Sequence, residues 1–175
     1  MCDWLCEKLA SWGLVKVPII EEKRFFNGET VELDVRNFFV NPDNAELQMI
    51  VEQFELSTVE DVKHWVFSHI DYTPEEKDFW QLPFETLARR EGDCDDQAIL
   101  TAALLLAIGK RYFDVMIQVV ETPRGWHCFT TYKGKVVDPL FLDLTVIPED
   151  WKFWYCWNPK SCYTSKENYN IWRGA

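Results

Sequence analysis

The chain has 175 residues, of which 47% are hydrophobic and 27% charged, a size and composition typical of one folded domain. Its formal net charge is −11, with 29 acidic against 18 basic residues. Such a field repels nucleic-acid phosphates and anionic lipid headgroups, so it argues against nucleic-acid binding and favours neutral or basic partners. We expect a single domain over residues 1–175.

Because no secretory signal is seen, we expect a cytoplasmic protein, and its compact core fits a prokaryotic or a viral source. The N-terminus lacks a basic region ahead of an apolar one, and the longest apolar run, 102–108, is too short to span a membrane. The six cysteines form no CxxC pair, so we expect reduced thiols. The sequence does not decide whether Cys156 and Cys162 form a disulfide, nor which oligomeric state the protein adopts.

The first 40 residues are expected to lie outside the catalytic core. Residues 1–15 predict a short amphipathic helix, because four apolar side chains recur at helical spacing. These are Trp4, Leu5, Leu9 and Trp12. Residues 17–40 have a turn signal at 27–29 between apolar runs, which predicts a peripheral hairpin.

Three helices are predicted next. Residues 43–56 and 59–70 each have helical periodicity, and Thr58 with Asp61 resembles a capping box at the start of the second. Pro83 is suited to the first turn of a further short helix.

A long helix is predicted from about Cys94 to Ile108, closed by Gly109. It is apolar almost all round, so it should be the central buried helix. Four strand-like runs follow it, at 115–120, 126–132, 136–138 and 151–157.

The chemistry-bearing segment is the start of that long helix. Gly92 permits a tight turn into the helix, Asp93 is a candidate N-cap, and Asp96 falls at the N3 position. Cys94 then lies in the first turn, where unsatisfied amides and the helix dipole favour a thiolate and can donate to an oxyanion. The carboxylates of Asp93, Asp95 and Asp96 oppose thiolate formation, so a cationic histidine would have to outweigh them.

His127 and Asp138 are the candidate partners of Cys94. His127 lies in a predicted strand, and Asp138 ends the next strand after a tight turn, so a hairpin can bring both side chains together on one face. The other two histidines, His64 and His69, lie on the helix before the cysteine. Nucleophile, base and orienting carboxylate then occur in the order that nucleophilic catalysis requires.

These segments resemble the transglutaminase-like superfamily, most closely its microbial and phage cysteine peptidases. The resemblance covers roughly residues 58–142, and its most specific part is the run Gly92-Asp93-Cys94-Asp95-Asp96, followed by Trp126-His127 and Val137-Asp138-Pro139. It implies an α+β, papain-like fold, in which the cysteine helix packs on an antiparallel sheet that carries the histidine and the aspartate. It also implies a catalytic triad of Cys94, His127 and Asp138.

The resemblance implies a cysteine-dependent hydrolase, a peptidase or amidase, that attacks an amide carbonyl of a protein or peptide substrate and passes through a thioester. Two alternatives stay open: a protein-glutamine transglutaminase that passes the acyl group to an amine, and a non-catalytic binding module. A chain of 175 residues has no room for flanking β-sandwich domains, which argues against the animal-type crosslinking enzyme.

Few further groups are expected at the site. Gln81 or Trp80, shortly before the cysteine, could donate a side-chain N–H to an oxyanion. No cofactor is expected. Calcium at Asp93, Asp95 and Asp96 is a weaker alternative to capping and solvation, because the spacing does not match an EF-hand.

The aromatic run 151–157 is expected to cover the sheet or to line a substrate groove. Strict alternation would place four of its side chains on one face. These are Trp151, Phe153, Tyr155 and Trp157. Alternation also predicts that Cys128 points to the face opposite His127, into the core.

Overall fold

A computed structural model describes residues 13–24, 30–74, 79–165 and 167–168. The helix expected over 1–15 lies almost wholly outside these residues. Among the helices described, none is long and apolar enough to cross a membrane.

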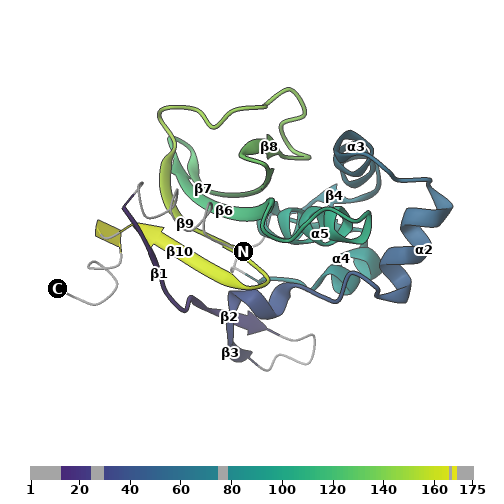
Figure 1. Ribbon diagram of the computed structural model, residues 1–175, viewed down its shortest axis with the longest axis horizontal. Coiled ribbons are helices and arrows are strands. Elements are labelled where there is room, and N and C mark those ends of the chain that lie inside the picture. The colour runs from purple at the N-terminus through teal and green to yellow at the C-terminus, as the bar shows by residue number, and fades with distance from the viewer. Residues whose placement is uncertain (1–12, 25–29, 75–78, 166, 169–175) are drawn as a thin grey trace.

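The centre of the protein is a six-stranded antiparallel sheet with the order β1-β10-β9-β6-β7-β8 (Figure 1). Its strands are β1 (Leu14–Lys16), β6 (Val115–Thr122), β7 (Gly125–Tyr132), β8 (Lys135–Val137), β9 (Lys152–Asn158) and β10 (Ser161–Ser165). After β8 the chain returns across the sheet to pair β9 with the other side of β6. The predicted strands are present, while β1 and β10 were not predicted.

The helices gather on one side of this sheet (Figure 1). They are α2 (Ala45–Gln53), α3 (Val59–His69), α4 (Pro83–Arg89) and α5 (Cys94–Ala107), preceded by the short 3-10 helix η1 (Val35–Phe38). Helix α5 packs against β6 and β7, and α2, α3 and α4 pack around it. Every α5 residue from 95 to 106 is buried, as the apolar sequence predicted. The predicted α+β class is therefore confirmed.

Two small pairings flank the sheet. Strands β2 (Ile20–Arg24) and β3 (Thr30–Asp34) form the hairpin that was predicted within 17–40. The two-residue strands β4 (Asp71–Tyr72) and β5 (Glu91–Gly92) pair in parallel. This second pairing fixes the path of the chain immediately before α5.

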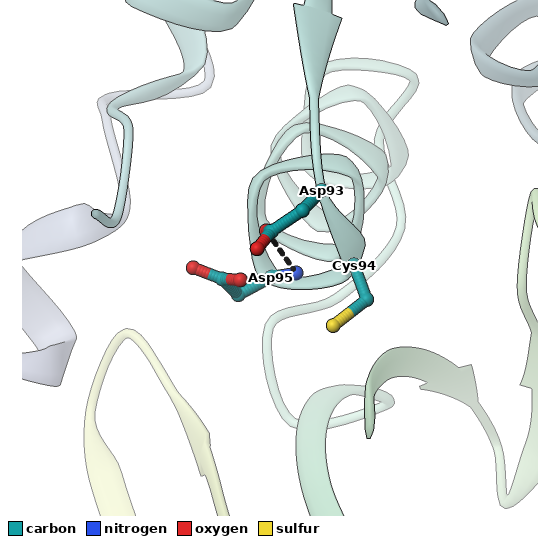
Figure 2. Close-up of side chains that lie close together, drawn as sticks. All are labelled: Asp93, Cys94 and Asp95. Carbon is teal, nitrogen blue, oxygen red and sulfur yellow. Dashed lines mark hydrogen bonds between the residues drawn. The ribbon is translucent and has the colours of Figure 1, made fainter. Parts of the chain in front are cut away.

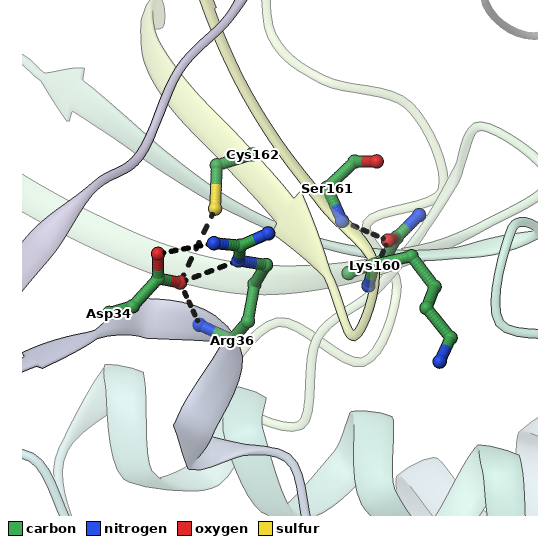
Figure 3. Close-up of polar contacts among 6 residues, drawn as sticks. Asp34, Arg36, Lys160, Ser161 and Cys162 are labelled. Carbon is green, nitrogen blue, oxygen red and sulfur yellow. Dashed lines mark hydrogen bonds and ion pairs between the residues drawn. The ribbon is translucent and has the colours of Figure 1, made fainter.

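A polar cluster joins the hairpin to β10 (Figure 3). The Asp34 carboxylate caps η1 by accepting from the backbone N–H of Arg36 and also pairs with the Arg36 guanidinium, while the Cys162 thiol lies 4.0 Å from Asp34 Oδ1. At the turn before β10, the side chain of Asn158 accepts from the backbone N–H groups of Lys160 and Ser161.

Cys156 and Cys162 are both thiols rather than a disulfide. In the β9–β10 ladder Cys162 pairs with Trp157 and Cys156 pairs with Tyr163, so the two sulfurs point to opposite faces of the sheet. Burial raises the pKa of the Cys162 thiol to about 11, and the charge of Asp34 adds to the effect.

The aromatic run does not alternate as predicted. The β6–β9 register shifts between Val119 and Val120, which pair with Tyr155 and Phe153, so Trp154 occupies a β-bulge. Trp154 therefore packs with Tyr155 and Trp157 against the main core. Phe153 packs on the other face, and Trp151 joins a third cluster beside Phe129.

Candidate active site

The first turn of α5 carries the candidate nucleophile (Figure 2). Asp93 is the N-cap, as predicted: its side chain accepts from the N–H of Asp95, and Asp96 at N3 accepts from the Asp93 N–H, so the two residues form a capping box. Cys94 follows as the first helical residue and is half-buried.

Gly92 has a different role from the one predicted. A Cβ at this position would lie 2.6 Å from the Asp96 Cβ and 2.8 Å from Asp96 Oδ2. Gly92 does not have a positive φ, so the chain needs glycine here because the Asp96 side chain approaches the backbone closely, and not because the turn is left-handed.

Asp96 ties the start of α5 to the segment before α4. Its Oδ1 accepts from the Gln81 backbone N–H at 2.7 Å, and its Oδ2 accepts from Gln81 Nε2 at 2.6 Å. Asp96 and Gln81 are both fully buried. Asp96 is therefore a structural acceptor that holds the turn carrying Cys94.

His127 and Asp138 meet as the hairpin geometry predicted. The register of β7 and β8 leaves Asp138 immediately after β8, beside the strand that carries His127. His127 Nε2 lies 2.7 Å from Asp138 Oδ2, and both residues are buried. Asp138 Oδ1 accepts from the Leu140 backbone N–H at 2.9 Å. Both carboxylate oxygens therefore accept hydrogen bonds.

Three aromatic side chains surround the imidazole of His127. It stacks on Phe129 with ring centroids 5.8 Å apart, and its ring meets Phe141 and Trp151 edge-on at 5.4 Å and 5.2 Å. These contacts restrict rotation of the ring and exclude water from the histidine–aspartate pair.

A buried lysine holds the loop that follows Asp138. Lys63 on α3 donates to the backbone carbonyl of Leu142 at 2.9 Å and pairs with Glu60 at 2.8 Å. The other two histidines take no part in the site: on the same helix, Nδ1 of His64 and Nδ1 of His69 each contact a backbone carbonyl one turn earlier.

A pocket of about 470 Å³ brings Cys94 and His127 together. Its lining residues are Glu21, Tyr72, Pro74, Trp80, Asp93, Cys94, Asp95, Val119, Trp126, His127, Cys128, Trp154 and Tyr155. The volume is in the range of small-molecule and peptide side-chain sites. Asp138 lies behind His127 and is not part of the lining.

The two oxyanion candidates differ in position. Trp80 lines the pocket, although its ring is largely buried against Phe38 and Trp157. Gln81 does not line the pocket, and its side-chain amide donates to Asp96 at 2.6 Å and to the Glu91 carbonyl at 3.4 Å. The geometry therefore favours Trp80 over Gln81 as a donor.

The acidic group beside Cys94 separates into two parts. Ligand atoms of Asp93, Cys94 and Asp95 all lie within 4.8 Å of one another, whereas Asp96 is not part of this group. Burial raises the pKa of the Asp95 carboxyl well above its ordinary value, and the hydrogen bond and charge of Asp93 add to the effect. Asp95 Oδ2 has no hydrogen-bond partner among the residues that the structure describes.

Part of the pocket could not be identified from the sequence. Glu21 arrives from the β2–β3 hairpin, about a hundred residues from His127, and no motif marks it. Trp154 reaches the pocket through the β-bulge, which strict alternation does not predict. Cys128 packs in the main core as predicted, yet it also contributes to the lining.

Solved structures similar to this one come from Legionella pneumophila LapG. The EGTA-treated form has a TM-score of 0.60 and 16% identity, and the match covers 73% of this chain and 87% of that one. The calcium-bound form has a TM-score of 0.59 and 17% identity, with coverage of 75% and 84%. At such identities the likeness shows a shared fold. No curated protein has significant sequence similarity to the chain.

The model of one protein family matches residues 44–163, well over half of the chain and wider than the 58–142 that carry the sequence resemblance. The match begins just before α2 and ends within β10, so it takes in the whole of α5 and most of the central sheet. The chain belongs to the transglutaminase-like domain family.

Proposed function

We propose that this protein is a cysteine-dependent hydrolase, a peptidase or amidase, that cleaves amide bonds of a protein or peptide through Cys94, His127 and Asp138. The observation that carries the proposal is the 2.7 Å contact between His127 Nε2 and Asp138 Oδ2, behind a pocket that Cys94 and His127 both line. A nucleophile at a helix start, a base and an orienting carboxylate are the parts that such chemistry needs.

The contact with Asp138 assigns separate roles to the two ring nitrogens of His127. A carboxylate only accepts, so Nε2 carries the proton that it donates to Asp138. In the neutral ring Nδ1 is then the unprotonated nitrogen, the one able to take the thiol proton from Cys94. The Asp138 charge also stabilises the imidazolium that forms.

The proposed acylation begins when the Cys94 thiolate attacks the amide carbon. The developing oxyanion is stabilised by N–H groups at the start of α5, where the helix dipole is positive, with the Trp80 indole as a second candidate. Collapse breaks the C–N bond, and the protonated His127 passes its Nδ1 proton to the leaving amine. An acyl thioester on Cys94 remains.

In the second half, His127 removes a proton from water, which attacks the thioester and releases the carboxylic acid and the thiol. Cys94 is half-buried and Trp126 in the same pocket is largely exposed, so solvent has access to the thioester. Access of water favours hydrolysis over transfer to an amine. Release of product acid in preference to incorporation of a labelled amine tests this choice.

Alkylation by iodoacetamide, followed at each cysteine by peptide mass spectrometry, tests the proposed nucleophile. Between about pH 8.5 and pH 6 the thiolate fraction of an ordinary thiol falls by roughly 100-fold. We expect the Cys94 rate to fall by less than about tenfold, because an imidazolium partner keeps the sulfur ionised. Burial raises the thiol pKa of Cys128 and Cys162, so both should react slowly.

The matched control is His127→Ala, in which the Cys94 rate should regain the pH dependence of an ordinary thiol. His64→Ala removes a histidine outside the pocket and should change nothing. A Cys94 that reacts like an ordinary thiol in the unaltered protein would contradict the proposed mechanism and favour a binding module.

Calcium is a second ligand that the site could hold. One solved LapG structure is described as calcium-bound. In this chain Asp93 and Asp95 present carboxylate oxygens within 4.8 Å of each other, and Asp95 Oδ2, which makes no hydrogen bond within the described part of the chain, would gain a ligand bond. Asp96 does not fit, since its oxygens accept from Gln81. We propose a weak site made by Asp93, Asp95 and water, where bound calcium would offset the negative charge beside Cys94.

Thermal unfolding with and without calcium tests this site. We expect millimolar calcium, compared with EGTA, to raise the Tm of the unaltered protein by a few degrees, because binding to the folded state alone stabilises it. Asp95→Asn should abolish the shift, and the exposed Asp43→Asn should retain it. An equal shift in all three proteins would indicate nonspecific binding and remove calcium from the site.

A further inference from the structure

One wall of the pocket comes from outside the family domain. Glu21 lies in strand β2 of the hairpin, ahead of residue 44 where the family match begins, yet it lines the same pocket as Cys94. A side chain added to a shared catalytic core is well placed to set which substrate this member accepts.

The Glu21 carboxylate is held in place by the sheet. Tyr155 donates its hydroxyl proton to Glu21 Oε1 at 2.7 Å. Burial raises the pKa of Tyr155 well above its ordinary value, and the charge of Glu21 adds to this, so the phenol stays protonated and acts as the donor. The structure therefore fixes a carboxylate at the wall of the pocket.

Two indole rings line the same pocket. Trp126 and Trp154 meet edge-on with ring centroids 5.3 Å apart. Trp126 is 60% exposed, which is unusual for so large an apolar side chain. Indole rings and a carboxylate in one pocket form a combination suited to an organic cation, since the ring quadrupole and the charge both attract it.

The other acidic groups of the pocket add no positive charge. Its lining contains the carboxylates of Glu21 and Asp93 and the buried carboxyl of Asp95, and none of the described lining residues is Lys or Arg. Asp95 is buried, and none of the described residues hydrogen-bonds to its Oδ2, so a donor from a ligand would satisfy it. The pKa of Tyr72 is raised by partial burial and then by the charges of Cys94, Asp93 and Asp95.

We propose that Glu21, Trp126 and Trp154 form a subsite for a basic side chain, Lys or Arg, of the peptide whose amide bond lies at Cys94. The assignment deepens the proposed hydrolase function and rests on it for the identity of the ligand as substrate. Charge complementarity selects the ammonium or guanidinium group, and the indole rings pack against the methylene stem.

Binding to Cys94→Ala protein tests the subsite without any need for turnover. The probes are acetyl-Ala-Lys-Ala-amide and its norleucine counterpart, which keeps the four-carbon stem and lacks the ammonium. Affinities come from tryptophan fluorescence in EGTA buffer, so that no divalent cation occupies the carboxylates. We expect the lysine peptide to bind at least about tenfold more tightly, a typical effect of a partly desolvated cation on a carboxylate and aromatic rings.

Adding Glu21→Gln should reduce the preference for the lysine peptide to less than about twofold, because only weak interactions of the ammonium group with more distant charges remain. The matched control is Glu32→Gln, which removes an exposed carboxylate from the same hairpin and should leave the preference intact. Unchanged Tm values show that both variants fold.

Equal binding of the two peptides, or a lysine preference that survives Glu21→Gln, would overturn the subsite. If the preference holds and depends on Glu21 while the unaltered protein cleaves neither peptide nor protein, the hydrolase proposal fails and the subsite stands as a peptide-binding site. The two proposals therefore fail in different measurements.

Discussion

Replacing Asp138 with asparagine is expected to lower kcat by about 10³- to 10⁴-fold, as removal of the orienting carboxylate does in other triads. The physical reason is that two N–H donors point at the Asp138 carboxylate, and asparagine would place its own NH₂ donor against one of them. Asp138 accepts from His127 Nε2 and from the Leu140 backbone N–H at the same time. Asparagine has one acceptor oxygen and one NH₂ group, so it cannot accept both bonds.

The contact between the asparagine NH₂ group and the His127 Nε2–H is most easily relieved by a change of the histidine tautomer. If the asparagine oxygen stays with Leu140, its NH₂ group faces His127 Nε2, which must then accept and give up its proton. The proton moves to Nδ1, the nitrogen that the mechanism needs as the base. Nitrogen-15 NMR of the imidazole should therefore show a change from the Nε2–H to the Nδ1–H tautomer.

Two further measurements separate this effect from a general loss of structure. Asp143→Asn changes an exposed carboxylate in the same loop and should retain full kcat. The Tm of Asp138→Asn should fall by only a few degrees, since a buried contact becomes mismatched and no cavity forms. Retention of more than about a tenth of kcat, with the tautomer unchanged, would show that Asp138 does not orient His127.

The fold around Cys94, His127 and Asp138 could be predicted because local signals dominate there. Helix α5 is apolar all round and begins with the Asp93 and Asp96 capping box, so both its burial and its first residue follow from the sequence. The contact of His127 with Asp138 follows from one tight turn between adjacent strands. In each case the determining residues lie within about a dozen positions of one another.

What escaped prediction depends on distant contacts. Strand β10 has no clear alternation of its own, and its pairing with β1 joins segments from opposite ends of the chain. The bulge at Trp154 arises from the register against β6, which no feature of the 151–157 run encodes locally. Glu21 reaches the pocket only because its hairpin packs near Tyr155.

The calcium question shows a related limit. The sequence places three carboxylates around Cys94, and as possible calcium ligands their spacing does not distinguish them. The structure separates them. Both carboxylate oxygens of Asp96 accept hydrogen bonds from Gln81, while Asp93 and Asp95 lie together beside the Cys94 sulfur. Which carboxylate is structural therefore depends on Gln81, fifteen positions earlier, and not on the run itself.

Asp96→Ala is expected to have the largest effect on stability, a loss of about 3–5 kcal/mol, because it leaves the buried Gln81 backbone N–H without its acceptor and removes the shorter of the two hydrogen bonds of Gln81 Nε2. In a domain of this size the loss corresponds to a fall of roughly 10 °C in Tm. Chemical denaturation should show this loss, whereas Asp43→Ala, at an exposed position, should change the free energy of unfolding by less than about 0.5 kcal/mol.

A double-mutant cycle with Gln81→Ala tests the cause. The double variant should lose less free energy of unfolding than the sum of the losses in the two single variants. Additive costs would mean that Asp96 stabilises α5 through its cap alone.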